Sequence, residues 1–143
     1  MTSFHDRLDE PRIVQTIADA ERTTSGEIRV HLERHCNEPV LDRAVEVFAN
    51  LHMHQTKDRN GVLIYIAYQD QMFAIIGDAG INTRVEDDFW EREKDLLSQH
   101  FKQGQFTEGI CKAISLIGER LQEYFPYRPD DQNELPNEVS KGD

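Results

Sequence analysis

Residues 62–68 read VLIYIAY, and residues 72–77 read MFAIIG. The first run is continuously apolar and rich in branched and aromatic side chains, which is typical of a central β-strand. The residues Gln69-Asp70-Gln71 between the two runs predict a short turn, so the two strands form an antiparallel hairpin. The rest of the fold can be inferred outward from this hairpin.

A further strand is predicted at Glu27–Glu33, where Ile28, Val30 and Leu32 alternate with polar or charged residues. Such alternation is typical of a strand that is covered on one side only or that lies near a sheet edge. Apolar residues recur at helical spacing over 41–51, between this strand and the hairpin. Because a helix joins the two strands, we expect them to be parallel, with a right-handed crossover.

Three more helices are predicted outside this unit. The first begins near Pro11 and carries apolar residues up to Ala20. The second passes through Val85 and Phe89 to Phe101, and the third spans Phe106–Tyr124. The sequence therefore predicts an α/β fold with a small mixed sheet, a βαββ core, flanked by four helices.

The chain of 143 residues has the length of one ordinary domain. From Pro126 onward it reads PYRPDDQNELPNEVSKGD, which contains almost no apolar residues. Such a composition buries too little surface to offset the entropy lost on ordering. We therefore expect an α/β domain at residues 1–126 and a disordered acidic tail at residues 127–143.

The formal net charge of −11 bears on partners and location. It argues against nucleic acid, whose binding depends on clustered Lys and Arg, and against a polybasic contact with anionic membranes. The longest apolar run, Val62–Ala67, is far too short for an integral membrane segment. The sequence shows no targeting segment, and Cys36 and Cys111 lie far apart, so we expect reduced thiols and a cytoplasmic location.

The predicted connectivity brings three loops to one end of the sheet: Thr24–Glu27, Thr56–Gly61 and Gly77–Asp88. Calcium takes six to eight oxygen ligands in flexible geometry, from carboxylates, carbonyls and water. Oxygen-bearing side chains on or beside these loops are the candidate metal ligands: Glu27, Asp58, Asn60, Asp78, Asp87 and Asp88. We therefore expect Ca²⁺ or another divalent cation as the ligand.

Ordinary structural roles explain part of this acidic set. The spacing does not match an EF-hand, since the twelfth position from Asp78 is Phe89 rather than Glu. The carboxylates at Glu86–Asp88 fall in the first turns of the predicted helix, where the positive end of the helix dipole stabilises negative charge. Zinc is a further alternative, for which His52 and His54 could join Asp78 in a mixed site.

Several short motifs, in the same order along the chain, resemble the TPM domain family of thylakoid-lumen, photosystem-repair-like and bacterial proteins. The resemblance covers about residues 11–126. The motifs that carry it are Thr24-Ser25-Gly26-Glu27-Ile28, Thr56 with Asn60-Gly61-Val62-Leu63-Ile64, Gly77-Asp78-Ala79-Gly80-Ile81, Phe89-Trp90, Phe101–Gly109 and Tyr124-Phe125-Pro126.

The resemblance implies a three-layer α/β/α sandwich, and it also bears on function. Some members of the family are associated with acid phosphatase activity and some bacterial members with bound calcium. The main hypothesis is therefore a small cytoplasmic binding or accessory domain that binds calcium or another divalent cation through carboxylates at one end of the sheet.

Two other functions stay open. One is a metal-assisted acid phosphatase at the same loops, with Arg59 and Arg84 near the phosphate and Asp78 as nucleophile or ligand. The sequence contains no aspartyl-phosphate, cysteine-loop or Gly-rich phosphate signature, so this hypothesis depends mostly on the resemblance. The other is a protein-interaction scaffold without ligand, which binds an unidentified protein through the tail or an exposed sheet face.

Overall fold

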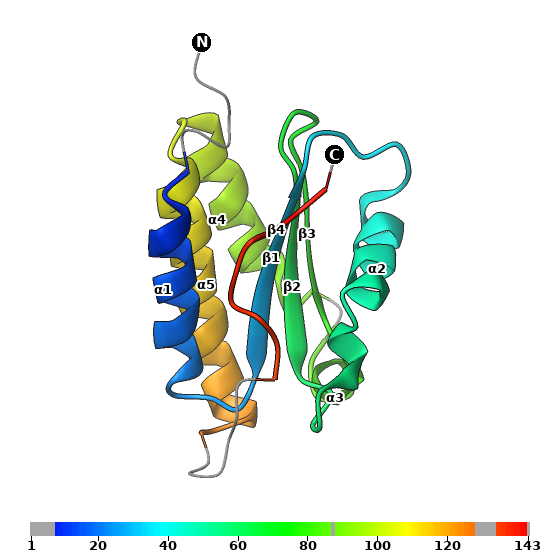
Figure 1. The fold of residues 1–143 in the computed structure, drawn as a ribbon, viewed down its shortest axis with the longest axis vertical. Coiled ribbons are helices and arrows are strands. Elements are labelled where there is room, and N and C mark those ends of the chain that lie inside the picture. The colour runs from blue at the N-terminus through cyan, green and yellow to red at the C-terminus, as the bar shows by residue number, and fades with distance from the viewer. Residues whose placement is uncertain (1–7, 87, 128–133, 143) are drawn as a thin grey trace.

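The structure is a computed structural model that describes residues 8–86, 88–127 and 134–142. The helices and strands in these ranges are shown in Figure 1. In chain order they are α1 (Glu10–Glu21), β1 (Glu27–Glu33), α2 (Val40–Asn50), the 3₁₀ turn η2 (Met53–Gln55), β2 (Gly61–Ala67), β3 (Met72–Gly77), α3 (Ala79–Asn82), α4 (Glu91–Lys102), α5 (Phe106–Tyr124) and β4 (Ser140–Lys141).

The sheet contains the predicted βαββ core, with the strand order β3-β2-β1-β4. β1 and β2 are parallel and in register from Glu27↔Gly61 to Glu33↔Ala67. β2 and β3 form the predicted antiparallel hairpin, which begins at the pair Val62↔Gly77. The mixed sheet inferred from the connectivity is thereby confirmed.

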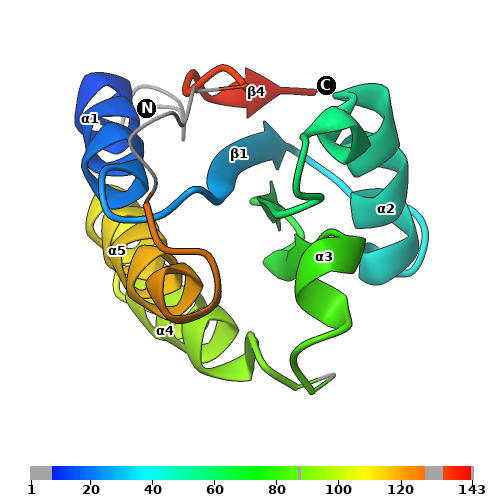
Figure 2. The same ribbon diagram turned by 90° about the horizontal axis from the view of Figure 1, so that it is seen from below.

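Helices cover both faces of this sheet, which gives the three-layer sandwich (Figure 2). α1, α4 and α5 lie on one face, and α2 and α3 lie on the other. The larger core cluster lies between the sheet and the first group, and it includes Ile28, Val30 and Trp90. A smaller cluster, with Phe48 and Tyr65, lies beneath α2. The alternating residues of β2 therefore divide between the two core clusters.

Residues 134–142 differ from the expectation of disorder over 127–143, while residues 128–133 and 143 lie outside the described residues. Residues 134–142 lie along β1, and β4 pairs with it in parallel at His31↔Ser140 and Leu32↔Lys141. Leu135 is buried within the smaller core cluster. The low apolar content was misleading because the segment docks mainly through backbone hydrogen bonds, which composition does not report. β1 is accordingly buried along its whole length, next to the edge rather than covered on one side only.

The segment after β3 also differs from the expectation of a continuous helix to Phe101. The short helix α3 ends at Asn82, and α4 begins only at Glu91, so Glu86 and Asp88 precede the helix. Arg120 on α5 donates to the carbonyl of Phe89, and its guanidinium lies 3.7 Å from the Phe89 ring centre. This contact fixes the residue in a turn, which a helical pattern in the sequence cannot reveal.

Candidate functional site

The three predicted loops do meet at one end of the sheet. The parallel pairing places the starts of β1 and β2 together, and the hairpin returns the end of β3 to the same place. Hydrogen bonds join the loops directly, because Glu27 N donates to Asn60 O at 3.3 Å and Asp78 N donates to Gly61 O at 2.9 Å. The site therefore has a backbone framework made by three separate chain segments.

Gly80 lets α3 approach the loop before β2 very closely. Its amide donates to the carbonyl of Arg59 at 2.8 Å. A Cβ at this position would lie 2.3 Å from the carbonyl oxygen of Asp58 and 2.6 Å from that of Arg59. Since backbone atoms cannot yield as a flexible side chain can, only glycine allows this contact.

Asp78 ties the same two loops together through its carboxylate. Oδ1 accepts hydrogen bonds from Ala79 N at 2.7 Å and from Arg59 Nη2 at 2.8 Å, and Oδ2 accepts one from Arg59 Nε at 2.8 Å. Asp78 is also the N-cap of α3. Both carboxylate oxygens of this predicted ligand are therefore engaged within the chain.

Glu27 is engaged in a different way. Its side chain is buried, with 2% of the residue exposed. One carboxylate oxygen accepts from the amide of Glu134 at 2.7 Å, and the other accepts from the amide of Leu135 at 2.9 Å. Glu27 therefore binds the backbone of the C-terminal segment.

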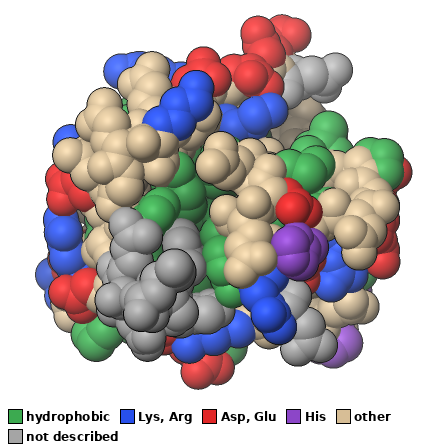
Figure 3. Space-filling model, turned by 90° about the horizontal axis from the view of Figure 1, so that it is seen from above, with side chains coloured by type: hydrophobic (Ala, Val, Ile, Leu, Met, Phe, Trp, Pro, Cys, Tyr) green, Lys and Arg blue, Asp and Glu red, His purple; other side chains and the backbone are tan. Residues whose placement is uncertain are grey.

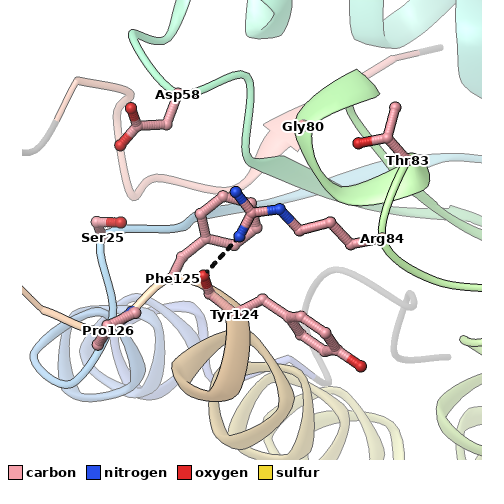
Figure 4. Close-up of a pocket in the computed structure, with 8 residues that line it drawn as sticks. All are labelled: Ser25, Asp58, Gly80, Thr83, Arg84, Tyr124, Phe125 and Pro126. Atoms are coloured by element: carbon pink, nitrogen blue, oxygen red, sulfur yellow. Dashed lines mark hydrogen bonds between the residues drawn. The ribbon is translucent and has the colours of Figure 1, made fainter.

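A pocket of about 370 Å³ opens beside these loops (Figure 4). Its lining comes from the three loops and from the end of α5: Ser25, Asp58, Gly80, Thr83, Arg84, Tyr124, Phe125 and Pro126. Figure 4 shows Asp58 and Ser25 on one side of the pocket and Arg84 and Thr83 on the other. A volume of this size suits a small ligand.

Behind Ser25 lies Asn60, which is almost fully buried, with 1% of the residue exposed. Its Nδ2 donates to the hydroxyl of Ser25 at 3.3 Å. Its Oδ1 is buried and has no hydrogen-bond partner in the structure. An unsatisfied buried acceptor is uncommon in native proteins and calls for a specific explanation, such as a bound water or ion.

Arg84 supplies the positive charge of the pocket. Its Nη1 donates to the backbone carbonyl of Tyr124 at 2.9 Å, and its guanidinium lies 4.6 Å from the ring centre of Phe125 (Figure 4). The end of α5 therefore holds this arginine across from Asp58.

Comparison with known proteins gives the family. The model of the TPM domain matches residues 5–120 of the chain. The chain belongs to the TPM domain family. The chain is also similar to the BA42 protein of the psychrophilic bacterium Bizionia argentinensis. Its structure matches the NMR structure of that protein with a TM-score of 0.90, and the two sequences are 49% identical over 99% of this chain and 100% of that one. No curated protein matches, and none of the helices described here is long and apolar enough to cross a bilayer.

The six predicted ligands of this TPM domain have different fates. Asp58 lines the pocket, and Asn60 lies behind it. Glu27 and Asp78 lie at the same end but make the contacts given above. Asp88 is exposed and is not among the residues that line the pocket, and Asp87 lies outside the described residues.

Sequence reasoning missed the part that α5 contributes. Phe125 accepts two hydrogen bonds through its carbonyl, from the amide of Ser25 at 2.9 Å and from the hydroxyl of Thr24. The following residue, Pro126, forms a β-bridge with Thr24. These contacts join the end of α5 to the first loop, and the Phe-Pro pair after the helix was the only signal in the sequence.

The donor set of the pocket limits the metals that it suits. Among the residues that the structure describes, no group of three or more His, Cys, Asp or Glu side chains could hold a metal ion. The rings of His52 and His54 are 6.5 Å apart, and Asp78, their proposed zinc partner, is bound to Arg59. The side chains that line the pocket offer one carboxylate and hydroxyl oxygens, which are donors of the kind that hard cations such as calcium prefer, rather than zinc.

The opposite end of the sheet holds a second cluster of charges, centred on Glu33. Its carboxylate accepts from Arg43 Nε at 2.9 Å and Nη2 at 3.0 Å, and also from the hydroxyl of Tyr65. His31 Nε2 lies 3.0 Å from the same carboxylate. Figure 3 looks onto this end, where acidic, basic and histidine side chains are interspersed. The donors to Glu33 all come from the chain itself, so the cluster has a structural explanation.

Proposed function

We propose that this TPM domain is a small cytoplasmic binding domain that holds a divalent cation, with calcium as the first candidate, in the pocket beside Asp58. The observation that carries the proposal is the convergence of oxygen-bearing side chains from three loops on one pocket. Calcium is bound by such mixed oxygen sets. The net charge of −11 favours cation binding, and the two free cysteines suit a reducing compartment.

Four side chains are the proposed ligands. Asp58 supplies the negative charge, and Ser25 and Thr83 supply hydroxyl oxygens from the other two loops. The buried Oδ1 of Asn60, which has no partner, is the fourth candidate. Backbone carbonyls and water complete calcium shells of six to eight oxygens in proteins, so four side chains are a sufficient start.

Titration of metal-free, full-length protein with calcium tests this proposal. We expect heat of binding and a melting temperature that rises with calcium concentration, because a ligand that binds only the native state stabilises it. Asp58→Asn should abolish both effects. The matched control, Asp88→Asn, should leave them unchanged because Asp88 does not line the pocket. Absence of heat and of a melting shift at millimolar calcium would refute the proposal.

A second candidate is a metal-assisted acid phosphatase, and Arg84 is the observation that favours it. A guanidinium across a pocket from a carboxylate can donate to phosphate oxygens while the carboxylate side holds the cation. A bound cation would supply a polarised phosphoryl group and a more acidic water. The matching family model also carries the name TPM phosphatase.

An aryl-phosphate assay with added divalent cation tests the second candidate. We expect activity that Arg84→Gln and Asp58→Asn each reduce at least tenfold, since each removes a group that contacts phosphate or cation. Arg22→Gln is the matched control, because Arg22 is exposed and lies outside the pocket. Activity that survives both pocket substitutions has another source and excludes this pocket as the catalytic site.

A further inference from the structure

Residues 134–142, here called the C-terminal clasp, run beside β1 from the pocket end of the sheet to the Glu33 end (Figure 1). Only two residues of the clasp, those of β4, form strand pairs with β1. The remaining contacts are made at separate points. These points show what the clasp does for the rest of the molecule.

The first point is Glu27. Its two carboxylate oxygens accept the consecutive amides of Glu134 and Leu135, as described above. Hydrogen bonds from N–H groups to an ionised carboxylate are stronger than those between neutral groups, above all in a buried position. Glu27, which the sequence suggested as a metal ligand, is therefore the main anchor of the clasp.

The second point is the loop that carries Asp58. The amide of Lys57 donates to the carboxylate of Glu134 at 3.0 Å. Leu135 is 8% exposed and packs in the smaller core cluster with Met53. A Cβ added at Gly61 would come within 3.8 Å of Leu135 Cδ1, so the leucine also borders the end of this loop. The clasp thus holds the residues on both sides of Asp58.

The third point is the far end of the clasp. The amide of Gly142 donates to the carbonyl of Leu32 at 2.7 Å, and Lys141 Nζ lies 2.6 Å from the carboxylate of Glu10. A Cβ at Gly142 would lie 2.5 Å from Glu33 Oε1 and 3.1 Å from His31 Nε2. Arg43 and Tyr65 hold the Glu33 carboxylate in place, so a larger residue at position 142 should push this end of the clasp away from β1.

We propose that the clasp is a detachable strand that orders the Asp58 loop, so that the pocket is complete only while the clasp is docked. A two-residue strand at the edge of a sheet belongs to the parts of a fold that open at low cost in free energy. Its release would break the hydrogen bond of Lys57 and withdraw Leu135 from beside Gly61, which would loosen the loop between Lys57 and Gly61. The part of this proposal that concerns the ligand rests on the proposed function. Calcium binding should then raise the affinity of the clasp for β1 by the same factor by which a docked clasp raises the affinity for calcium.

Amide hydrogen exchange of the metal-free, full-length protein, followed by NMR, tests the structural half. Two variants release the clasp at opposite ends: Glu27→Gln and Gly142→Val. The reporters are the amides of Asn60 and Gly80, which bond to Thr56 Oγ1 and Arg59 O and do not touch the clasp. We expect both variants to raise exchange at these reporters at least tenfold.

The control for this experiment is Glu138→Gln, because Glu138 contacts Arg29 through its backbone carbonyl. It should exchange like the wild type. The amide of Ile114, in the middle of α5, shows that each variant is folded. Loss of protection at Glu134 and Leu135 without change at Asn60 and Gly80 would overturn the proposal. Unchanged protection at Glu134 and Leu135 in Glu27→Gln would overturn it as well.

Calcium titration of the same variants tests the functional half. We expect Glu27→Gln to bind calcium at least fivefold more weakly than the wild type, within the usual range of coupling between sites. Equal affinity in a variant whose clasp is released would refute the coupling. If the wild type binds no calcium, the proposed function fails, while the exchange experiment still decides whether the clasp orders the loop.

Discussion

The two ends of β1 each lie beside a carboxyl group whose pKa is strongly shifted, and the shifts have opposite signs. Burial acts to raise the pKa of Glu33, but the hydrogen bonds from Arg43, Tyr65 and His31 outweigh it and lower the pKa to about 2. Burial raises the pKa of Glu21, at the end of α1 and beside the start of β1, to about 8. There the amide of Ile28 opposes the rise and the nearby charge of Glu27 adds to it.

The difference lies in the partners rather than in the residue type. The Glu33 end supplies a guanidinium and a phenol to one carboxylate, so the charge is stabilised and no donor is left over. The other end supplies Glu21 with one backbone amide and places a second carboxylate nearby. Negative charge is thus stabilised at the Glu33 end, whereas burial disfavours the charged form of Glu21 at the other end, where the pocket lies. Four substitutions test this contrast.

The largest effect is expected for Glu33→Gln. It leaves Arg43 and the buried hydroxyl of Tyr65 without an ionised acceptor, which should cost about 3 kcal/mol of unfolding free energy. Glu46→Gln is the matched control, because it also contacts Arg43 but its side chain is 50% exposed, against 4% for Glu33. The control should change stability by less than about 0.5 kcal/mol. Urea denaturation at pH 7 measures both, and equal losses would contradict the contrast.

The cost of Glu33→Gln should also depend on pH. The pKa of Glu33 is about 2 in the folded protein and about 4.3 in an unfolded chain. The unfolded state therefore takes up the proton first, and the stabilisation present above pH 4.3 is lost as the pH falls toward 2. Denaturation at pH 7, 4 and 3 should show the difference between wild type and variant shrinking. A constant difference would mean that Glu33 acts through packing instead.

Gly80→Ala should have the next largest effect and act at the pocket end. Its Cβ would collide with the carbonyls of Asp58 and Arg59, so we expect a loss of about 2 kcal/mol and weaker calcium binding. Asn82→Ala, at an exposed position of the same short helix, is the control. Thermal unfolding and calcium titration provide the two measurements. If Gly80→Ala matched the control in both, the close approach would not be essential.

Glu21→Gln should stabilise the protein, which reverses the sign of the Glu33 result. The folded pKa of Glu21 is about 8, so stability present below pH 4.3 is lost as the pH rises toward 8. Removing the charge should add about 1–2 kcal/mol at pH 8, after a discount for partial exposure, and nothing at pH 4. Exposed Glu123 provides the control substitution Glu123→Gln. A gain that is equal at both pH values would point to a cause other than titration.

The smallest change in stability is expected for Asp58→Asn, although it should have the largest effect on calcium binding. The side chain keeps its size at a half-buried position, so the ligand-free protein should change by less than about 1 kcal/mol. Calorimetry with and without calcium separates the two effects. A large loss in the absence of calcium would assign Asp58 a structural role like that of Glu33.

The hairpin, the parallel crossover and the meeting of three loops could all be predicted from sequence. They depend on local apolar patterns and on the lengths of the connections, and both can be counted along the chain. Asp58, a candidate metal ligand in the sequence, lines the pocket, and Asn60 lies behind it, while their role as ligands stays a prediction. Nothing in the sequence indicates that Arg59 pairs with Asp78 or that Glu27 binds the amides of Glu134 and Leu135.

The sequence by itself determined the three strands of the βαββ core, their order and the end of the sheet at which the acidic loops gather, but not β4. Only the tertiary structure decided which of those acids line the pocket and which bind groups elsewhere in the chain. Arg59 reaches Asp78, and the clasp reaches Glu27 from more than a hundred residues away in the chain. The spacing of residues along the sequence does not reveal contacts between segments so far apart. An acidic loop with a structural role therefore cannot be told from a ligand site until the fold shows which donors reach each carboxylate.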